Sequence, residues 1–444
     1  MSLITNVLAE HILATSRRAP SCDDRNMALK CVLDLVGAAI AGRDMPGPTA
    51  VRATARALLG AGSRPVWATG QTASLAGAVF ANASAASALD LDDGHRLARG
   101  HPGAAVIPTV LTLLPETDAG ASDLISAISV GYDVGVRIAA AQMPKMIATR
   151  QTGRWASIAA AAAGARLLRC RDDQVAQALA IAAVLAPNQQ ANGSSGYSQL
   201  TGNDVKEGIA WSAVLGLAAV NLAIGGHTGP ADVFDHPDYY DRNAIIDGLG
   251  ERSHLAGTYF KPYACCRYIH AALDAFLMLV DGSKIDASDI AFVEVETFGW
   301  ALKLGNKQRP TTLIDMQYSL PYCIAIAAIE GRDALAPLGA DLLEREDLSA
   351  FSKKVGLSVN PEIDALFPGE TLARVTISTR FYQLRSEILG PLGDPKRPMS
   401  FEAIEEKFQR VTRGVLSPER QRDIVAGVLD MPDDHGSGLL TALR

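Results

Sequence analysis

The central feature of this chain is the stretch Asp90-Leu-Asp-Asp-Gly-His95-Arg-Leu-Ala-Arg-Gly-His101-Pro-Gly103, which places three carboxylates, two arginines and two histidines between alanine-rich apolar runs. Ionisable groups are costly to bury unless they pair with one another or take part in chemistry. The flanking runs have apolar residues three and four apart, which is typical of buried helices. The stretch therefore predicts a helical interior that contains paired or reactive groups.

The end of this stretch predicts the start of a helix. Pro102 suits the first helical position, and an apolar run follows it. His101 would then lie at the helix N-terminus, where the positive end of the helix dipole disfavours the imidazolium ion. We therefore predict that His101 is a neutral, positioned base, and that Asp90 orients it or balances its charge.

Composition limits the classes of function. The 444 residues include 41 basic and 48 acidic side chains, and the net charge is −7. Without a basic block, this balance argues against a nucleic-acid partner. The six cysteines contain no CxxC pair, and the N-terminus has no signal-type pattern. We expect a cytoplasmic protein with no membrane span, in which the apolar run 209–226 is a buried core helix.

The length predicts two domains, and the sequence pattern changes near residue 265. Before this point the pattern is helical, and small residues are frequent. After it, alternating β-branched segments predict strands at 290–298, 354–359 and 373–381, with helices at 318–330 and 338–346. A helical tail begins at Ser400. The chain is therefore predicted to be mostly α, with a large all-helical domain (1–264 and 400–444) and a smaller α/β domain (265–399). The clearest helical segments of the first domain are 27–41, 75–89, 121–141, 155–168 and 173–184.

A second candidate motif is Lys261-Pro-Tyr-Ala-Cys-Cys-Arg-Tyr-Ile-His270-Ala-Ala-Leu-Asp274. If a helix starts near residue 264, Cys266, His270 and Asp274 lie on one face of it. The Lys261 ammonium and the free backbone N–H groups would then form a carboxylate or phosphate subsite, and the same field would lower the pKa of Cys266. The alternative is that the cysteines fill the core and that His270 is a buried, satisfied histidine.

Three further candidates are weaker. Lys206 precedes an apolar helix and is either an anion ligand or a solvated residue. Arg150 lies beside Gln-Thr-Gly and is either a cleft residue or a surface residue. Tyr322 begins a predicted helix and is either a proton donor or a packing residue.

The sequence predicts neither a metal nor a cofactor. An EF-hand that began at Asp90 would need glycine and glutamate where this chain has His95 and His101. A zinc site at Cys265, Cys266 and His270 lacks a fourth ligand. No dinucleotide fingerprint and no Walker loop occurs. We therefore expect the chemistry to depend on side chains alone.

Together these motifs resemble the MmgE/PrpD family, which includes 2-methylcitrate dehydratase, cis-aconitate decarboxylase and iminodisuccinate epimerase. The resemblance covers nearly the whole chain, and the motif stretches are most similar to the epimerase branch. It implies a homodimer with the active site between a helical and an α/β domain. Arg150 stands where the dehydratase and decarboxylase branches usually have a histidine, and Cys266 stands where decarboxylases tend to have one. The resemblance matches Asp90, His101, Lys206, Lys261, Cys266 and Tyr322 to active-site positions. We expect catalytic roles for Asp90, His101, Lys261, Cys266 and Tyr322, and substrate contacts from Lys206, Arg150, Arg267 and His270.

The function that follows is a cofactor-independent epimerase of the iminodisuccinate type. Its substrate would be a small anion with several carboxylates, and it would remove a proton next to one of them. Such chemistry needs preorganised cations for the developing charge. The alternatives are a lyase of the same family, either a dehydratase or a decarboxylase, and a binding protein without catalysis.

Overall fold

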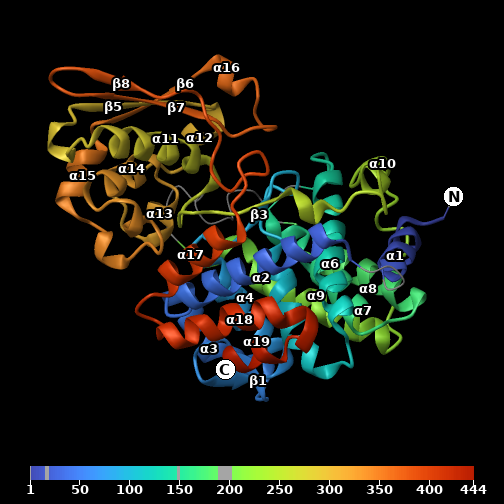
Figure 1. The fold of residues 1–444 in the computed structure, drawn as a ribbon. Coiled ribbons are helices and arrows are strands. Elements are labelled where there is room, and N and C mark those ends of the chain that lie inside the picture. The colour runs from blue at the N-terminus through green and yellow to red at the C-terminus, as the bar shows by residue number, and fades with distance from the viewer. Residues whose placement is uncertain (1, 16–19, 148–150, 189–202) are drawn as a thin grey trace.

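The computed structural model describes residues 2–15, 20–147, 151–188 and 203–444. Its larger part is helical, and its smaller part carries a sheet (Figure 1). This is the mostly α, two-part architecture that the sequence predicts. The helices of the larger part, in chain order, are α1 (Ile4–Ala14), α2 (Cys22–Gly42), α3 (Pro46–Leu59), α4 (Leu75–Ser87), α5 (Gly103–Leu113), α6 (Ala121–Ala141), α7 (Ala156–Leu167), α8 (Asp172–Leu185), α9 (Ile209–Ile224) and the short α10 (Arg242–Ile246).

Helix α7 lies at the centre of the larger part, and all of its residues are buried. Its alanines allow close approach of α6 and α9. A Cβ added to Gly135 of α6 would lie 2.7 Å from the Ala159 Cβ, and one added to Gly216 of α9 would lie 2.3 Å from the Ser157 carbonyl oxygen. Neither position can accept a larger residue without a shift of the backbone. Small residues on three helices therefore set the spacing of this core.

One short pair of strands brings the two sequence motifs together. Strand β3 (Gly94–His95) pairs antiparallel with β4 (Thr258–Tyr259), so that Gly94 lies opposite Tyr259. A Cβ on Gly94 would lie 2.4 Å from the Tyr259 hydroxyl oxygen, so this contact requires glycine. The pairing holds the charged stretch beside the segment that leads to Lys261. A second pair, β1 (Arg64–Val66) with β2 (Gln71–Ala73), lies elsewhere in the helical part.

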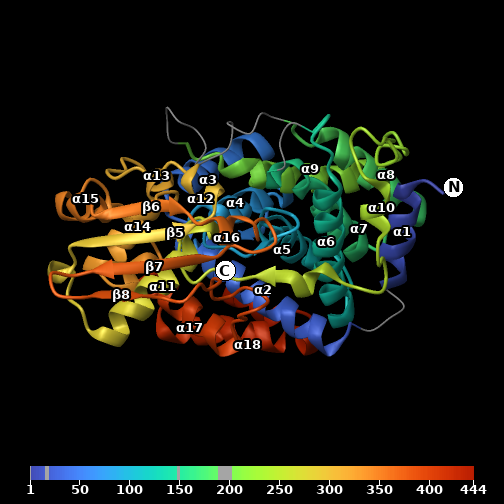
Figure 2. The same cartoon turned by 90° about the horizontal axis from the view of Figure 1, so that it is seen from above.

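The smaller part contains a four-stranded sheet in the order β6-β5-β7-β8 (Figure 2). Its strands are β5 (Phe292–Thr297), β6 (Val355–Val359), β7 (Ala373–Ser378) and β8 (Gln383–Arg385), and only the β5–β6 pairing is parallel. Three of these strands were predicted. The sheet packs with α11 (Arg267–Ser283), α14 (Leu320–Ile329) and α15 (Glu346–Ser352), and the short helices of this part are α12 (Gly299–Leu302), α13 (Leu313–Gln317) and α16 (Pro361–Asp364).

The predicted helix at 338–346 is wrong. Only a short 3-10 turn, Ala340–Leu342, forms there, and α15 begins later. Glu344 has a φ of +56°, in the left-handed region, which a continuous α-helix cannot contain. The periodicity of the leucines in this segment reflects burial in a loop.

The C-terminal helices return to the large part. They are α17 (Phe401–Thr412), α18 (Pro418–Asp434) and α19 (Ser437–Ala442), and α17 packs against α2. Ser400 caps α17 by accepting a hydrogen bond from the Ala403 N–H. Figure 2 shows α17 and α18 beside α2. The tail therefore packs against the helices that precede the charged stretch.

Within the part of the chain that the structure describes, two segments are long and apolar enough to cross a membrane by length and composition: α6 and Lys206–Ile224. The first is 89% buried inside the protein and the second 50%. The expectation of a buried core helix at 209–226 is therefore only half right. Trp211, Leu222 and Ile224 of α9 are exposed.

Candidate active site

Asp90 lies at the centre of a group of buried charges. Its Oδ1 accepts a hydrogen bond from Lys206 Nζ at 2.5 Å, and its Oδ2 lies 2.9 Å from Lys261 Nζ. All three residues are at most 3% exposed. Asp90 and Lys206 also have positive φ angles of 51° and 45°. Such strain in non-glycine residues is common at functional sites. We call Asp90, Asp92, His101, Lys206, Lys261 and Tyr318 the Asp90 cluster.

Two ammonium groups determine the charge of Asp90. Burial alone would raise its pKa, but Lys206 and Lys261 reverse this effect and hold the pKa of Asp90 well below its usual range. For Lys261, burial lowers the pKa and Asp90 raises it, and the net shift is upward. Although Lys261 Nζ is close to Asp90, it makes no well-aligned hydrogen bond with a described residue. Its donors are therefore available for a substrate oxygen.

His101 lies between two carboxylates. Its Nδ1 is 2.9 Å from the Asp93 carbonyl oxygen and 3.2 Å from Asp92 Oδ2, and its Nε2 is 3.6 Å from Asp90 Oδ1. Burial lowers the pKa of His101, but Asp92 and Asp90 outweigh burial, so that the pKa is raised. The prediction that the helix N-terminus disfavours the imidazolium is therefore wrong, because the two carboxylates favour it. His101 is better suited to donate a proton than the sequence indicated.

Asp93, the third carboxylate of the stretch, has a structural role. Asp93 accepts hydrogen bonds from the Tyr132 hydroxyl at 2.5 Å and from the Gly103 N–H, at the start of α5, at 3.1 Å. Burial and the nearby Asp34 raise the pKa of Asp93 to about 7. Asp34 itself pairs with Lys407 of α17, whose ammonium also donates to the Leu91 carbonyl. Each carboxylate of the stretch therefore has different partners.

The smaller part contributes Tyr318 to the cluster, and the sequence analysis missed it. The Tyr318 hydroxyl is 3.4 Å from Lys206 Nζ, and the ammonium lies 5.2 Å from the ring centroid. The preceding residue, Gln317, donates from its side chain to the Ala88 carbonyl and so holds the two parts together. The sequence Tyr318-Ser-Leu-Pro-Tyr322 carries two tyrosines, of which only Tyr322 was considered as a site residue.

Tyr322, the tyrosine that the sequence favoured, lies outside the cluster. Its hydroxyl donates a hydrogen bond to the Leu342 carbonyl at 2.6 Å, within the core of the smaller part. Ser319 caps α14, which places Tyr322 in the first turn, facing that core. The prediction of a catalytic role for Tyr322 is therefore not supported by its position.

The Lys261 motif folds differently from the expectation. Helix α11 begins at Arg267, and Cys266 is its N-cap. Burial raises the pKa of Cys266 to about 12, so the predicted lowering by the helix N-terminus is wrong. His270 lies 3.1 Å from the Cys265 carbonyl, and burial holds the pKa of His270 well below its usual range. Arg267 donates to two main-chain carbonyls and stacks on Tyr259. These contacts make His270 and Arg267 supports of the connecting segment.

Thr152 and Glu207 link His101 to the Lys206 turn. Thr152 donates from its hydroxyl to the Glu207 carboxylate at 2.8 Å and accepts from the His101 N–H at 3.2 Å. Glu207 has a φ of +59°. No pattern in the sequence indicates this link, because it joins loops that are distant in the chain. Arg150, a predicted substrate ligand, lies outside the described residues.

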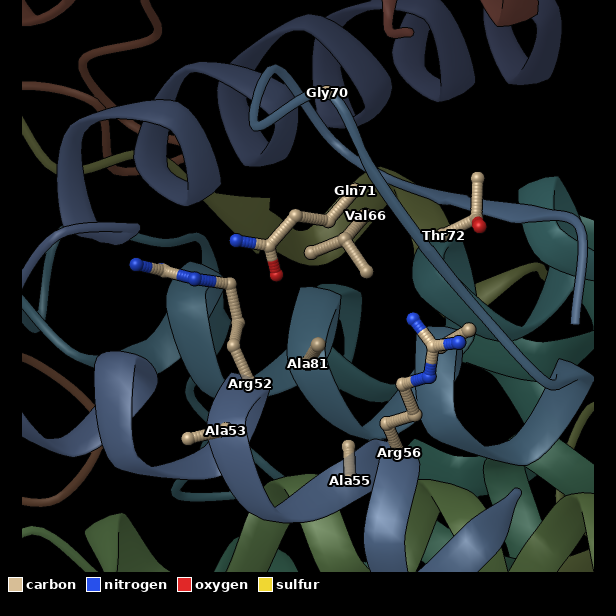
Figure 3. Close-up of a pocket in the computed structure, with 10 residues that line it drawn as sticks. Arg52, Ala53, Ala55, Arg56, Val66, Gly70, Gln71, Thr72 and Ala81 are labelled. Carbon is tan, nitrogen blue, oxygen red and sulfur yellow. The ribbon is translucent and has the colours of Figure 1, made fainter. Parts of the chain in front are cut away.

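A metal ion is a poor fit for the cluster. Among the described residues, one set has metal-ligand spacing: Asp90, Asp92 and His101, whose ligand atoms lie within 4.8 Å of one another. However, both Asp90 oxygens face ammonium groups, which would repel a cation. The absence of a metal remains a prediction. The pocket in Figure 3, of about 460 Å³, lies between α3, α4 and the β1–β2 pair, and it shares no residue with the cluster.

Comparison with known proteins agrees with this architecture. The chain is 26% identical to the cis-aconitate decarboxylase of Aspergillus terreus over 403 residues, which cover 82% of this chain and 79% of that protein. It is 24% identical to human cis-aconitate decarboxylase over 395 residues, which cover 82% and 78%. These relatives favour the lyase alternative over the epimerase reading. Residues 6–244 match the MmgE/PrpD N-terminal domain, and residues 263–431 match the MmgE/PrpD C-terminal domain. The chain is therefore a member of the MmgE/PrpD family.

Proposed function

We propose that this protein is a cofactor-independent lyase that decarboxylates a small, unsaturated tricarboxylate of the cis-aconitate type. The main support is the position of His101, a buried imidazole with a raised pKa that lies beside two lysines. The relatives named cis-aconitate decarboxylase support the same reaction class.

Decarboxylation of such a substrate needs a proton donor. The C–C bond to the leaving carboxylate breaks, and its electron pair forms a new double bond. The electrons of the old double bond then take a proton at its far carbon, and carbon dioxide leaves. We assign the proton to the His101 imidazolium, which solvent protonates again after each turnover. A raised pKa suits this role because the surroundings of the ring favour its protonated form.

The substrate carboxylates need cationic ligands in a dry site. Lys261 is the first candidate, because it has donors that are not aligned on any described acceptor. Lys206 and Tyr318 lie on the other side of Asp90 and supply a second anchor. Because the cluster is buried, each ammonium contributes more to binding and to charge stabilisation than it would in water.

Epimerisation is the second candidate. It is favoured by the two sequence departures from the decarboxylase branch, Arg150 and Cys266. An epimerase needs protonatable groups on both faces of a carbon. His101 and Lys261, which lie at different oxygens of Asp90, would supply them.

Proton NMR in deuterated buffer distinguishes these reactions. The purified protein is incubated with cis-aconitate and with a panel of di- and tricarboxylates. We expect release of carbon dioxide and one deuterium in the product. Exchange of a substrate C–H without carbon dioxide would favour the epimerase, and formation of a double bond with loss of water would favour a dehydratase. A His101→Gln variant is expected to lose at least about 10²-fold in kcat, and no loss would refute the assignment of the proton donor.

A further inference from the structure

Asp92 is a buried carboxylate that the proposed reaction does not use directly. It is fully buried, and neither of its oxygens has a hydrogen-bond partner among the described residues. Its one ion pair in the described part of the chain is with His101 Nδ1, at 3.2 Å. Burial of an ionised carboxylate without a partner lowers stability by roughly several kcal/mol. Asp92 therefore needs a cation.

The other buried cations nearby are already paired. Lys407 donates to Asp34 and to the Leu91 carbonyl, and Lys206 donates to Asp90. Lys261 lies on the opposite oxygen of Asp90. Lys261 and Lys407 also attract the charge of Asp92, but the one ion pair of Asp92 with a described residue is to His101. The proton on His101 is therefore the charge in direct contact with Asp92.

The hydrogen bond to the Asp93 carbonyl and the ion pair with Asp92 also fix the direction of the ring. The Asp93 carbonyl at 2.9 Å and Asp92 Oδ2 at 3.2 Å both face Nδ1, so this nitrogen carries a hydrogen in either charge state. Nε2 then faces Asp90 Oδ1 and the lysines. Proton transfer therefore takes place at Nε2, which faces the proposed substrate site, while Nδ1 keeps its hydrogen.

From this geometry we infer that Asp92 is the positioning residue of His101: it holds the imidazole with Nε2 toward the cluster and keeps it charged until the proton is given to substrate. This inference rests on the proposed function only in naming His101 as the donor. The sequence assigned this orienting role to Asp90, but both Asp90 oxygens face ammonium groups. The arrangement has the logic of a carboxylate–histidine pair, in which the carboxylate stabilises the imidazolium without taking its proton.

The titration of His101 tests the inference without any substrate. Among the described residues, the charged groups that most affect the pKa of His101 are Asp92, Lys261 and Asp90. With ¹⁵N-labelled histidine and the His101→Gln variant for assignment, NMR gives the pKa and the tautomer of His101. In Asp92→Asn we expect this pKa to fall by about one to three units, whereas Asp92→Glu should retain a raised value.

Kinetics supply the second measurement once a substrate is known. Asp92→Asn should lower kcat by about 10²-fold and change KM by less than about threefold, since the substrate ligands remain. Its pH profile should lose the limb that His101 causes. Asp133→Asn is the matched control, because Asp133 is also buried and paired with a histidine and an arginine, but outside the cluster. It should lower stability and leave the pKa of His101 and the pH profile unchanged.

The experiments distinguish a failure of the inference about Asp92 from a failure of the proposed function. If the pKa of His101 is the same in wild type and Asp92→Asn, the inference is refuted, even if the protein proves to be a decarboxylase. If the pKa shifts as expected and no tricarboxylate reacts, the inference stands and the proposed function fails. Should Asp92→Asn not fold, the wild-type titration decides: a His101 pKa at or below that of a free imidazole would refute the role of Asp92.

Discussion

Asp93→Asn should remove a specific part of the pH dependence of stability. Asp93 is buried, and its carboxyl pKa is raised from 3.8 to about 7. Between these values the unfolded chain has lost the proton while the folded protein keeps it. Folding therefore takes up a proton, and the stability from this group falls as the pH rises toward the folded-state pKa. From pH 5 to pH 8 the loss is about 3 kcal/mol.

The comparison of two proteins isolates this effect. Asparagine has nearly the same shape as aspartate: its Oδ1 can accept from the Gly103 N–H, and its Nδ2 can donate to the Tyr132 hydroxyl oxygen. The free energy of unfolding of wild type and Asp93→Asn is measured in urea at several pH values between 5 and 8. We expect the difference, wild type minus variant, to fall by about 3 kcal/mol over this range, because all other groups are common to both proteins.

An exposed carboxylate supplies the control. Asp173→Asn, at the start of α8, should follow wild type at every pH, because Asp173 is exposed to solvent. A difference between wild type and Asp93→Asn that stays constant from pH 5 to pH 8 would show that Asp93 is ionised throughout. In that case, the argument from burial and from Asp34 would be incorrect.

Four further substitutions distinguish the residues of the site from those that support it. Lys261→Met leaves Asp90 with one ammonium, so kcat should fall at least about 10²-fold and unfolding should become easier by about 3 kcal/mol, measured by turnover and urea titration. Arg137→Met removes a buried guanidinium that donates to four carbonyls. The free energy of unfolding, measured by thermal melting, should fall by about 3–5 kcal/mol, and KM should not change. Tyr318→Phe should lower kcat about tenfold. Tyr322→Phe should lower the free energy of unfolding by about 1–3 kcal/mol and leave kcat unchanged. Equal kcat values in these two variants would contradict the placement of Tyr318 in the site.

Helices and strands were predicted more accurately from the sequence than contacts between side chains. The all-apolar helix α7 and three of the four strands were predicted because their patterns report burial directly. The segment 338–346 was mistaken for a helix, because leucines buried in a loop can have helical spacing. The left-handed conformation of Glu344 has no signal in the residue type.

The candidate site was predicted in its composition but not in its electrostatics. Asp90, His101, Lys206 and Lys261 were all named, and the structure brings them together. The charge of His101 was misjudged because it depends on Asp92, whose position relative to the ring is fixed by tertiary structure. Tyr318 and Tyr322 lie one helical turn apart in sequence, and only the start of α14 decides which one faces Lys206.

The ion pair between Lys407 and Asp34 has a consequence for how the protein is synthesised. Lys407 reaches the carbonyl of Leu91, within the charged stretch, from a helix near the end of the chain. A nascent chain on the ribosome holds the Asp90 stretch long before α17 has left the exit tunnel. Until then Asp34 has no counter-ion, and the loop that carries Asp90 and Asp92 lacks its support. The charged stretch should therefore reach its final arrangement only after translation is nearly complete.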